Sequence, residues 1–165
     1  MTKVIAMHGR AGLEVVHDDA PDAGPRITFC SHCGGRPEGD VESRVCSSCE
    51  LGLLLETSAS AAPVEGGAFL VVDNSMSICA VSAAAEQLLA TRETDAVNHH
   101  VTELIVPADA EAQGRANLAV AVTWAARGDQ TARNVFVRPA NTFGVRMTAR
   151  IAGCGPPQAA LVVFD

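Results

Sequence analysis

Two Cys-x-x-Cys pairs constrain the fold of this 165-residue chain more than any other feature. The four cysteines are Cys30, Cys33, Cys46 and Cys49, with 12 residues between the two pairs. A two-residue gap lets a tight turn aim both thiolates of a pair at one point, and four soft thiolates in a tetrahedron suit Zn²⁺. Gly34 and Gly35 follow the first pair and permit the positive φ that such a turn often needs. The spacing therefore predicts a structural zinc site whose four ligands close it.

Other chemistries for four cysteines fit less well. Iron takes the same thiolates, but the short loop and the scarcity of aromatic residues do not resemble rubredoxin. A thioredoxin-like pair opens a helix after a strand in an α/β unit, which two copies 12 residues apart do not match. Disulfides require export, and a catalytic zinc requires an open coordination position. His32 lies inside the first pair, where it is either a substitute ligand or, as we expect, an exposed histidine.

The charge balance bears on what the cysteine segment contacts. The chain has a net charge of -7, and residues 27–56 hold two Arg against Glu38, Asp40, Glu42, Glu50 and Glu56. Nucleic-acid binding needs clustered Lys and Arg, which the sequence lacks, so we expect no such contact. In its knuckles, "CSHCGG" and "CSSC", residues 27–56 resemble the zinc ribbon family. Ribbons bind nucleic acid, bind protein or stabilise a fold, and the acidic balance leaves the last two roles.

The remainder of the N-terminal part is less informative. Residues 1–26 are of uncertain structure, with "KVIAM" and "LEVV" as possible short strands, and residues 57–67, "TSASAAPVEGG", are expected to be a linker. No apolar run approaches the ~18–20 residues of a membrane span, and "MTKVIAMHGRAG" does not read as a signal peptide. We therefore expect a cytoplasmic protein with reduced cysteines. Arg supplies 11 of the 12 basic residues, which with abundant Ala and Val indicates a GC-rich bacterial genome.

From residue 68 onward the pattern becomes regular. Apolar runs at 68–73 and 77–82 predict two strands, and 83–91 and 115–129 have the apolar spacing of helices. Residues 92–112 are expected to form short helical turns, broken by Pro107. Three strands follow at 131–139, 143–151 and 159–164, and strict alternation over 143–151 predicts a sheet with one buried face. Strands at both ends of a helical middle predict an α+β fold with an antiparallel sheet.

Residues 68–165 resemble a PAS domain, the small sensory module of bacterial signalling proteins. The resemblance rests on "FLVVDNSMSICAVSAAAEQLLA", on "VPAD" before the long helix and on the three closing strands. Asp73 fits the turn between the first two strands. Ser82 stands where Asn is common, Ala90 or Thr91 where Gly is common, and Asn98 where a second Gly often lies. The resemblance implies a five-stranded sheet with helices on one face, and a role in sensing or dimerisation.

The resemblance also directs attention to cofactors and a pocket. Neither flavin nor haem is expected, since the Asn-Cys-Arg motif of LOV photosensors is absent and the long helix carries no His. Cys79 and Cys154 are expected to be small buried hydrophobes. The row Arg146, Thr148 and Arg150 is either the wet face of the sheet or a site for carboxylates. A ligand pocket or a filled core would be lined by Val71, Ile78, Leu88, Leu104, Leu118, Val122, Phe136, Val145 and Met147.

These observations favour a non-enzymatic signalling or regulatory protein. The sequence has no Ser/His/Asp spacing, no phosphate-cradling Gly loop and no HExxH motif, so we expect no catalysis. The expected protein is a PAS-like sensor or interaction module with a structural zinc ribbon used for contact with a protein partner. A homodimer through either part and an unknown small ligand are also compatible, and a membrane is not. The alternative is a nucleic-acid-associated transcriptional regulator that acts through the ribbon.

Overall fold

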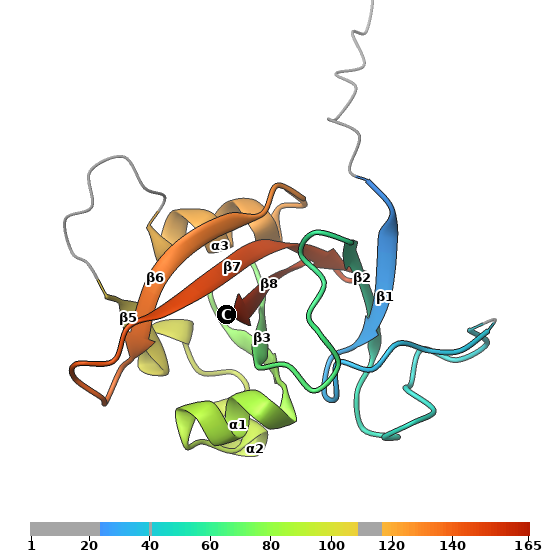
Figure 1. Cartoon of the computed structure of the whole chain (residues 1–165), viewed down its shortest axis with the longest axis horizontal. Coiled ribbons are helices and arrows are strands. Elements are labelled where there is room, and N and C mark those ends of the chain that lie inside the picture. Colours follow the sequence, from blue (N-terminus) through green and yellow to red (C-terminus); the bar gives the residue numbers. More distant parts are fainter. Residues whose placement is uncertain (1–23, 40, 109–116) are drawn as a thin grey trace, which may run out of the picture.

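The computed structural model describes residues 24–39, 41–108 and 117–165. Within them, eight strands form one curled antiparallel sheet accompanied by short helices (Figure 1). The strands are β1 (Arg26–Cys30), β2 (Leu54–Ser58), β3 (Phe69–Val72), β4 (Ile78–Val81), β5 (Ile105–Pro107), β6 (Arg133–Pro139), β7 (Met147–Gly155) and β8 (Ala159–Phe164). The helices are α1 (Ala83–Leu89), α2 (Glu93–Ala96), the 3-10 turn η1 (Val101–Glu103) and α3 (Leu118–Ala126). Among the described helices, none is both long enough and apolar enough to cross a membrane.

Strand β7 is the strand on which the rest of the sheet is assembled. β8 pairs along one edge of β7, while β6 and β2 share the other edge, β6 near its start and β2 at its end. The remaining strands extend the sheet in the order β8-β3-β4, β2-β1 and β6-β5. The cysteine-bearing hairpin β1–β2 is therefore part of the same sheet as the C-terminal strands.

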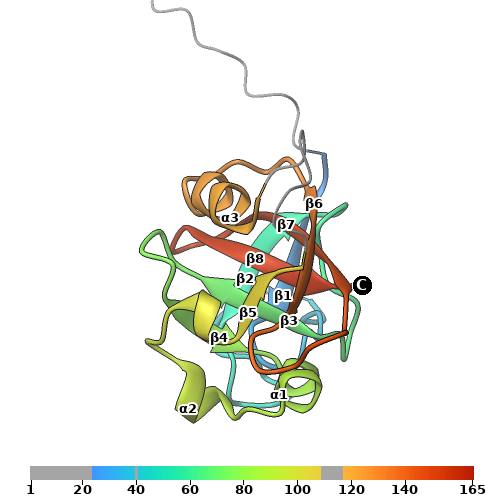
Figure 2. The ribbon, with the colours of Figure 1, turned by 90° about the vertical axis from the view of Figure 1, so that its left-hand side faces the viewer.

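Both faces of this sheet are covered over much of its area. On one face, alternate residues of β3 and β8, such as Leu70 and Val162, pack against the buried sides of α1, α2 and α3. The intervening residues, such as Leu161 and Phe69, pack on the other face against Phe29 of β1 and Leu55 of β2. Figures 1 and 2 show α3 at the opposite end of the molecule from α1 and α2. The β1–β2 hairpin thus covers a face that no described helix reaches.

The two longer helices, α1 and α3, each bury one apolar side against the core. Leu118, Val122 and Ala125 of α3 are buried at the expected spacing, and the Asn117 side chain caps this helix by accepting from the Val120 N–H at 2.9 Å. In α1, Ala85 and Leu89 are buried, whereas Leu88 is exposed, so only one of the two expected i, i+4 pairs faces the core.

The strand expectations need three corrections. The five expected strands all form, as β3, β4, β6, β7 and β8, but the sheet is larger because β1, β2 and β5 join it. Residues 105–107, predicted to lie among short helical turns, instead form β5, a strand of three residues that ends in Pro107. β7 begins at Met147, not at Phe143, because Gly144 at φ 80° lies in the loop before it.

The expectation of one buried face holds only for the first half of β7. There the apolar residues face the helices and Thr148 and Arg150 are half-buried, but from Ala152 onward both faces are buried. Cys154 lies beneath the β1–β2 hairpin, and Gly153 lies against the end of α3 and the turn that follows it. The start of the expected linker is likewise structured: Thr57 and Ser58 lie in β2, and Thr57 Oγ1 donates to the Gly153 carbonyl at 2.8 Å. The division of the chain into domains stays a prediction. The possible strands before residue 24 lie outside the described residues.

Candidate metal centre

The four cysteines of the two knuckles converge on one point. Their sulfur atoms all lie within 4.8 Å of one another. Sγ of Cys30 is 3.5 Å from Sγ of Cys49, and Sγ of Cys33 is 3.9 Å from Sγ of Cys46. A tetrahedron with zinc–sulfur bonds of about 2.3 Å has sulfur–sulfur edges of about 3.8 Å. The arrangement therefore fits a tetrathiolate metal site, and the sulfurs are too far apart for disulfide bonds.

The two knuckles are built by the same backbone turn. The N–H of Gly34 donates to the Cys30 carbonyl at 3.0 Å, and the N–H of Glu50 donates to the Cys46 carbonyl at 2.9 Å. Gly34 and Glu50, each four residues after the first cysteine of its pair, have left-handed backbone conformations, with φ of 70° and 56°. Glycine adopts this region without cost, which explains Gly34, whereas Glu50 holds it against the preference of its side chain. The predicted need for positive φ is thus met at Gly34 but not at Gly35.

Backbone amides surround the sulfurs. The N–H groups of His32 and Gly35 donate to the sulfurs of Cys30 and Cys33, each at 3.4 Å. Such N–H···S contacts stabilise thiolates and hold them in position around a cation. Only glycine fits at position 52, where the backbone passes close to the first knuckle. A Cβ there would lie 2.3 Å from Sγ of Cys30 and 2.7 Å from the backbone nitrogen of His32.

The thiols differ in how readily they ionise. Burial raises the pKa of Cys30 to about 12, and it also raises the pKa of Cys33. Burial opposes ionisation of Cys49 too, yet hydrogen bonds from the N–H groups of Leu51 and Gly52 lower its pKa to about 6. Without a metal, Cys49 is thus readily ionised, whereas Cys30 and Cys33 stay protonated at neutral pH. Coordination to a metal cation deprotonates such thiols. Metal binding at neutral pH must therefore release protons.

The first knuckle is held against the sheet and α1. The Cys33 carbonyl accepts from the Gly66 N–H at 3.1 Å, and the His32 carbonyl accepts from the Ala83 N–H, at the start of α1, at 3.0 Å. His32 is not the exposed residue that we expected. Its side chain is only 19% exposed, and Nδ1 lies 3.7 Å from a carboxylate oxygen of Glu93. No coordination role for His32 is needed, because the four cysteines already complete the set.

The second knuckle lies beside a groove. Pro37, Glu38, Val41, Glu42, Ser43, Val45, Ser47 and Leu54 line this hollow of about 250 Å³. Of these, Val41 and Val45 are each nearly half exposed, and so is Leu53, which pairs with Val45. We call this surface the ribbon groove. It combines exposed apolar side chains with two carboxylates, so it is neither a bare hydrophobic patch nor a basic one.

The nine residues proposed to line a pocket are divided among the two core clusters and the surface. Ile78, Leu118 and Val122 are buried in the core beneath the helices, with Leu104 and Met147 packed against it, whereas Val71 lies in the core on the other face of the sheet. Leu88 and Val145 are 44% and 41% exposed, and Phe136 is half-buried on β6. Six of the nine residues therefore belong to a hydrophobic core or pack against one.

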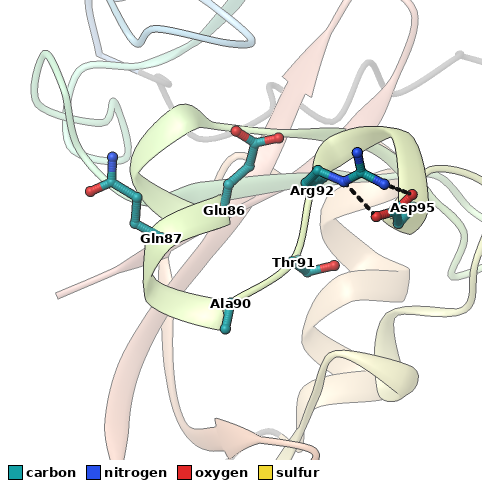
Figure 3. Close-up of a pocket in the computed structure, with 6 residues that line it drawn as sticks. All are labelled: Glu86, Gln87, Ala90, Thr91, Arg92 and Asp95. Carbon is teal, nitrogen blue, oxygen red and sulfur yellow. Dashed lines mark hydrogen bonds and ion pairs between the residues drawn. The ribbon is translucent and has the colours of Figure 1, made fainter.

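A different hollow opens beside α1 and α2. It measures about 400 Å³ and is lined by Glu86, Gln87, Ala90, Thr91, Arg92 and Asp95. Figure 3 shows its polar rim, where Arg92 binds both carboxylate oxygens of Asp95 at 2.8 and 3.0 Å. The lining is polar and open, and none of the nine predicted pocket residues belongs to it.

The two remaining cysteines differ from each other. Cys154 is buried in the core beneath the β1–β2 hairpin, as expected, and burial raises its pKa to about 12. Cys79 is exposed on β4, which corrects the expectation that both would be buried. His99 and His100 are exposed, and His100 caps η1 by accepting from the Thr102 N–H.

Comparisons of the chain with family models, with curated proteins and with solved structures found no match.

Proposed function

We propose that this chain is a non-enzymatic regulatory module in which a zinc-braced ribbon presents a protein-contact surface beside a PAS-like sensory domain. The observation that carries the proposal is the ribbon groove next to a closed tetrathiolate cluster. Four cysteines leave a bound metal no open position for substrate, so the metal would brace the knuckles and do no chemistry. The exposed apolar side chains beside them are then the functional surface.

Zinc is the metal that the donor set favours. Soft thiolates in a tetrahedron select zinc or iron among the metals of cells, and zinc has no redox chemistry to control. The first knuckle is hydrogen-bonded to Gly66 and to Ala83, which begins α1, so a metal bound by the knuckle would also hold these two segments. Zinc would therefore stabilise the junction between ribbon and sheet as well as the ribbon itself.

Three positions support the PAS-like part of the proposal. Ala90 and Asn98, which stand where the PAS pattern has glycine, adopt φ of 49° and 70°, a region that glycine favours. Ser82, which stands where Asn is common, is buried; its hydroxyl accepts from the Phe69 N–H and donates to the Gly67 carbonyl. The departures from the pattern thus keep the backbone and polar roles that the usual residues would serve.

The metal part is tested on purified protein by elemental analysis together with a visible spectrum. We expect bound zinc in wild type, no visible absorbance, and loss of zinc in Cys46→Ser. Cys79→Ser is the matched control, since Cys79 lies outside the cluster and should leave the zinc content unchanged. A coloured iron-loaded protein, or full zinc retention in Cys46→Ser, would show that the ligand assignment is wrong.

The contact part is tested with Val41→Asp, because Val41 lines the ribbon groove and is nearly half exposed. Val64→Asp is the control, because Val64 is an exposed valine that does not line the groove. We expect affinity for a purified protein partner to fall in Val41→Asp and to persist in Val64→Asp, with zinc content equal in both. Equal binding by both variants would refute the role of the groove. Binding of a nucleic-acid duplex that Val41→Asp weakens would favour the transcriptional alternative.

A further inference from the structure

The face of β6 and β7 that points away from α3 gathers positive charge in an acidic protein. Alternation along the paired strands places Asn134 and Phe136 of β6 opposite Arg150 and Thr148 of β7 on this face. Arg138 follows at the next outward position of β6, and Arg146 precedes β7. We call these residues, together with Phe143 in the connecting loop, the arginine face.

Two of its arginines lie over aromatic rings. The guanidinium carbon of Arg146 is 3.8 Å from the centroid of the Phe136 ring, and that of Arg138 is 4.9 Å from the centroid of Phe143. A guanidinium above a ring keeps its N–H groups directed outward in its own plane, where they can bind a carboxylate in a bidentate manner. Phe143 itself is 83% exposed, so the platform is accessible.

The chain already shows one carboxylate bound at the margin of this face. Nε and Nη2 of Arg150 each lie 3.1 Å from a different carboxylate oxygen of Asp165. For Arg138 the described residues offer only the carbonyls of Pro139 and Ala140, at 3.3 and 3.4 Å, and no carboxylate. Its charge is therefore available for an acidic group from outside the chain.

We propose that the arginine face binds an acidic segment of a protein partner, in which carboxylates alternate with apolar side chains. The carboxylates would pair with the guanidinium groups and the apolar side chains would cover Phe143. Arg and aromatic residues are the types enriched in protein interfaces. A nucleic acid is the weaker match, because phosphate binding needs a cluster of free Lys and Arg, and Arg150 of this face already pairs with Asp165. The inference does not rest on the zinc site or the ribbon groove, which lies elsewhere on the chain.

The test uses the full chain and a fluorescein-labelled peptide of alternating Asp and Leu. Fluorescence anisotropy at low salt is expected to show binding that weakens as salt rises. Arg138→Gln and Arg146→Gln should each weaken binding on the order of tenfold, as loss of a charge-assisted contact does. Arg92→Gln is the control, because Arg92 is a more exposed arginine on another surface, and it should bind as wild type does.

Three results would overturn the proposal: no peptide binding at low salt, equal weakening in all three variants, or a single-stranded oligonucleotide that binds more tightly than the peptide. A peptide of alternating Lys and Leu should not bind, and if it binds equally the attraction is not one of charge. Thermal unfolding identifies a variant that fails to fold. Arg146→Gln decides the matter if Arg138→Gln disturbs its loop, since Arg146 is exposed.

Discussion

Gly52→Ala is expected to weaken metal binding strongly although it changes no ligand. A Cβ at position 52 would lie 2.3 Å from Sγ of Cys30, 2.7 Å from the backbone nitrogen of His32 and 2.9 Å from its Cβ. Ordinary contacts of a Cβ begin near 3.4 Å, so the overlap with the sulfur exceeds an ångström. The backbone of the first knuckle cannot move aside cheaply, because His32 is bonded through its carbonyl to Ala83 at the start of α1.

The size of the effect follows from the cost of overpacking. Forcing a methyl group into a packed site costs about 1–3 kcal/mol, and here most of the cost falls on a ligand sulfur. Taking about 3 kcal/mol, and tenfold per 1.4 kcal/mol, the affinity for zinc should fall on the order of 100-fold. Because metal binding and folding of the knuckles are linked, the same loss should appear as a lower melting temperature only while zinc is present.

A series of three glycines makes the assay decisive. A Cβ at Gly35 would lie 3.2 Å from Sγ of Cys33, and a Cβ at Gly24 would meet nothing within 4 Å. Competition with a chromogenic chelator should therefore rank zinc affinity as Gly24→Ala, equal to wild type, then Gly35→Ala, then Gly52→Ala. Wild-type affinity in Gly52→Ala would refute the close packing of the knuckles, and equal losses in all three would refute a steric cause.

Three further predictions concern stability. Glu50→Gly and Ala90→Gly should each stabilise the protein by about 1 kcal/mol in urea unfolding, since both positions have positive φ, and a loss of stability in both would contradict this. Phe29→Ala should cost about 3–5 kcal/mol and lower the single unfolding transition of the whole chain; loss of a separate ribbon transition alone would contradict this. Burial acts to raise the pKa of Asp129, but the hydrogen bonds from Arg133 and Thr131 and the charge of Arg133 together outweigh it, so the pKa is lowered. Its contribution is present above the unfolded-state pKa and lost as pH falls through the folded pKa, so Asp129→Asn should destabilise the protein at pH ~7 and nearly match wild type well below pH ~4.

The sequence predicted best what is local. The knuckles follow from ligand spacing within a few residues, and the helix containing Leu118 and Val122 follows from its apolar period. It predicted poorly what depends on distant pairing. The contact of Thr57 with Gly153 spans 96 residues, and no local pattern in "TSASAAPVEGG" announces it. Alternation over 143–151 also begins before the strand does, because Val145 keeps the period in the loop that precedes β7.

The candidate sites divide in the same way. The metal ligands could be named from the sequence, since tetrathiolate spacing is specific. The ribbon groove could not, because Val41 and Leu53 become neighbours of one surface only after the knuckles close. The arginine row at Arg146 and Arg150 was visible as alternation, but the stacking on Phe136 that defines the face needs the pairing of β6 with β7.

The shared edge of β7 has a consequence for anyone who shortens the chain. A protein that begins at Ala68 would lose β1 and β2, and with them the cover over Leu161 and Val163. Its β7 would present bare backbone N–H and C=O groups at Cys154 and Gly155, next to a newly wetted apolar surface. Open strand edges of this kind recruit other chains. Residues 68–165 are therefore expected to precipitate when expressed alone, and the β1–β2 hairpin protects them against aggregation.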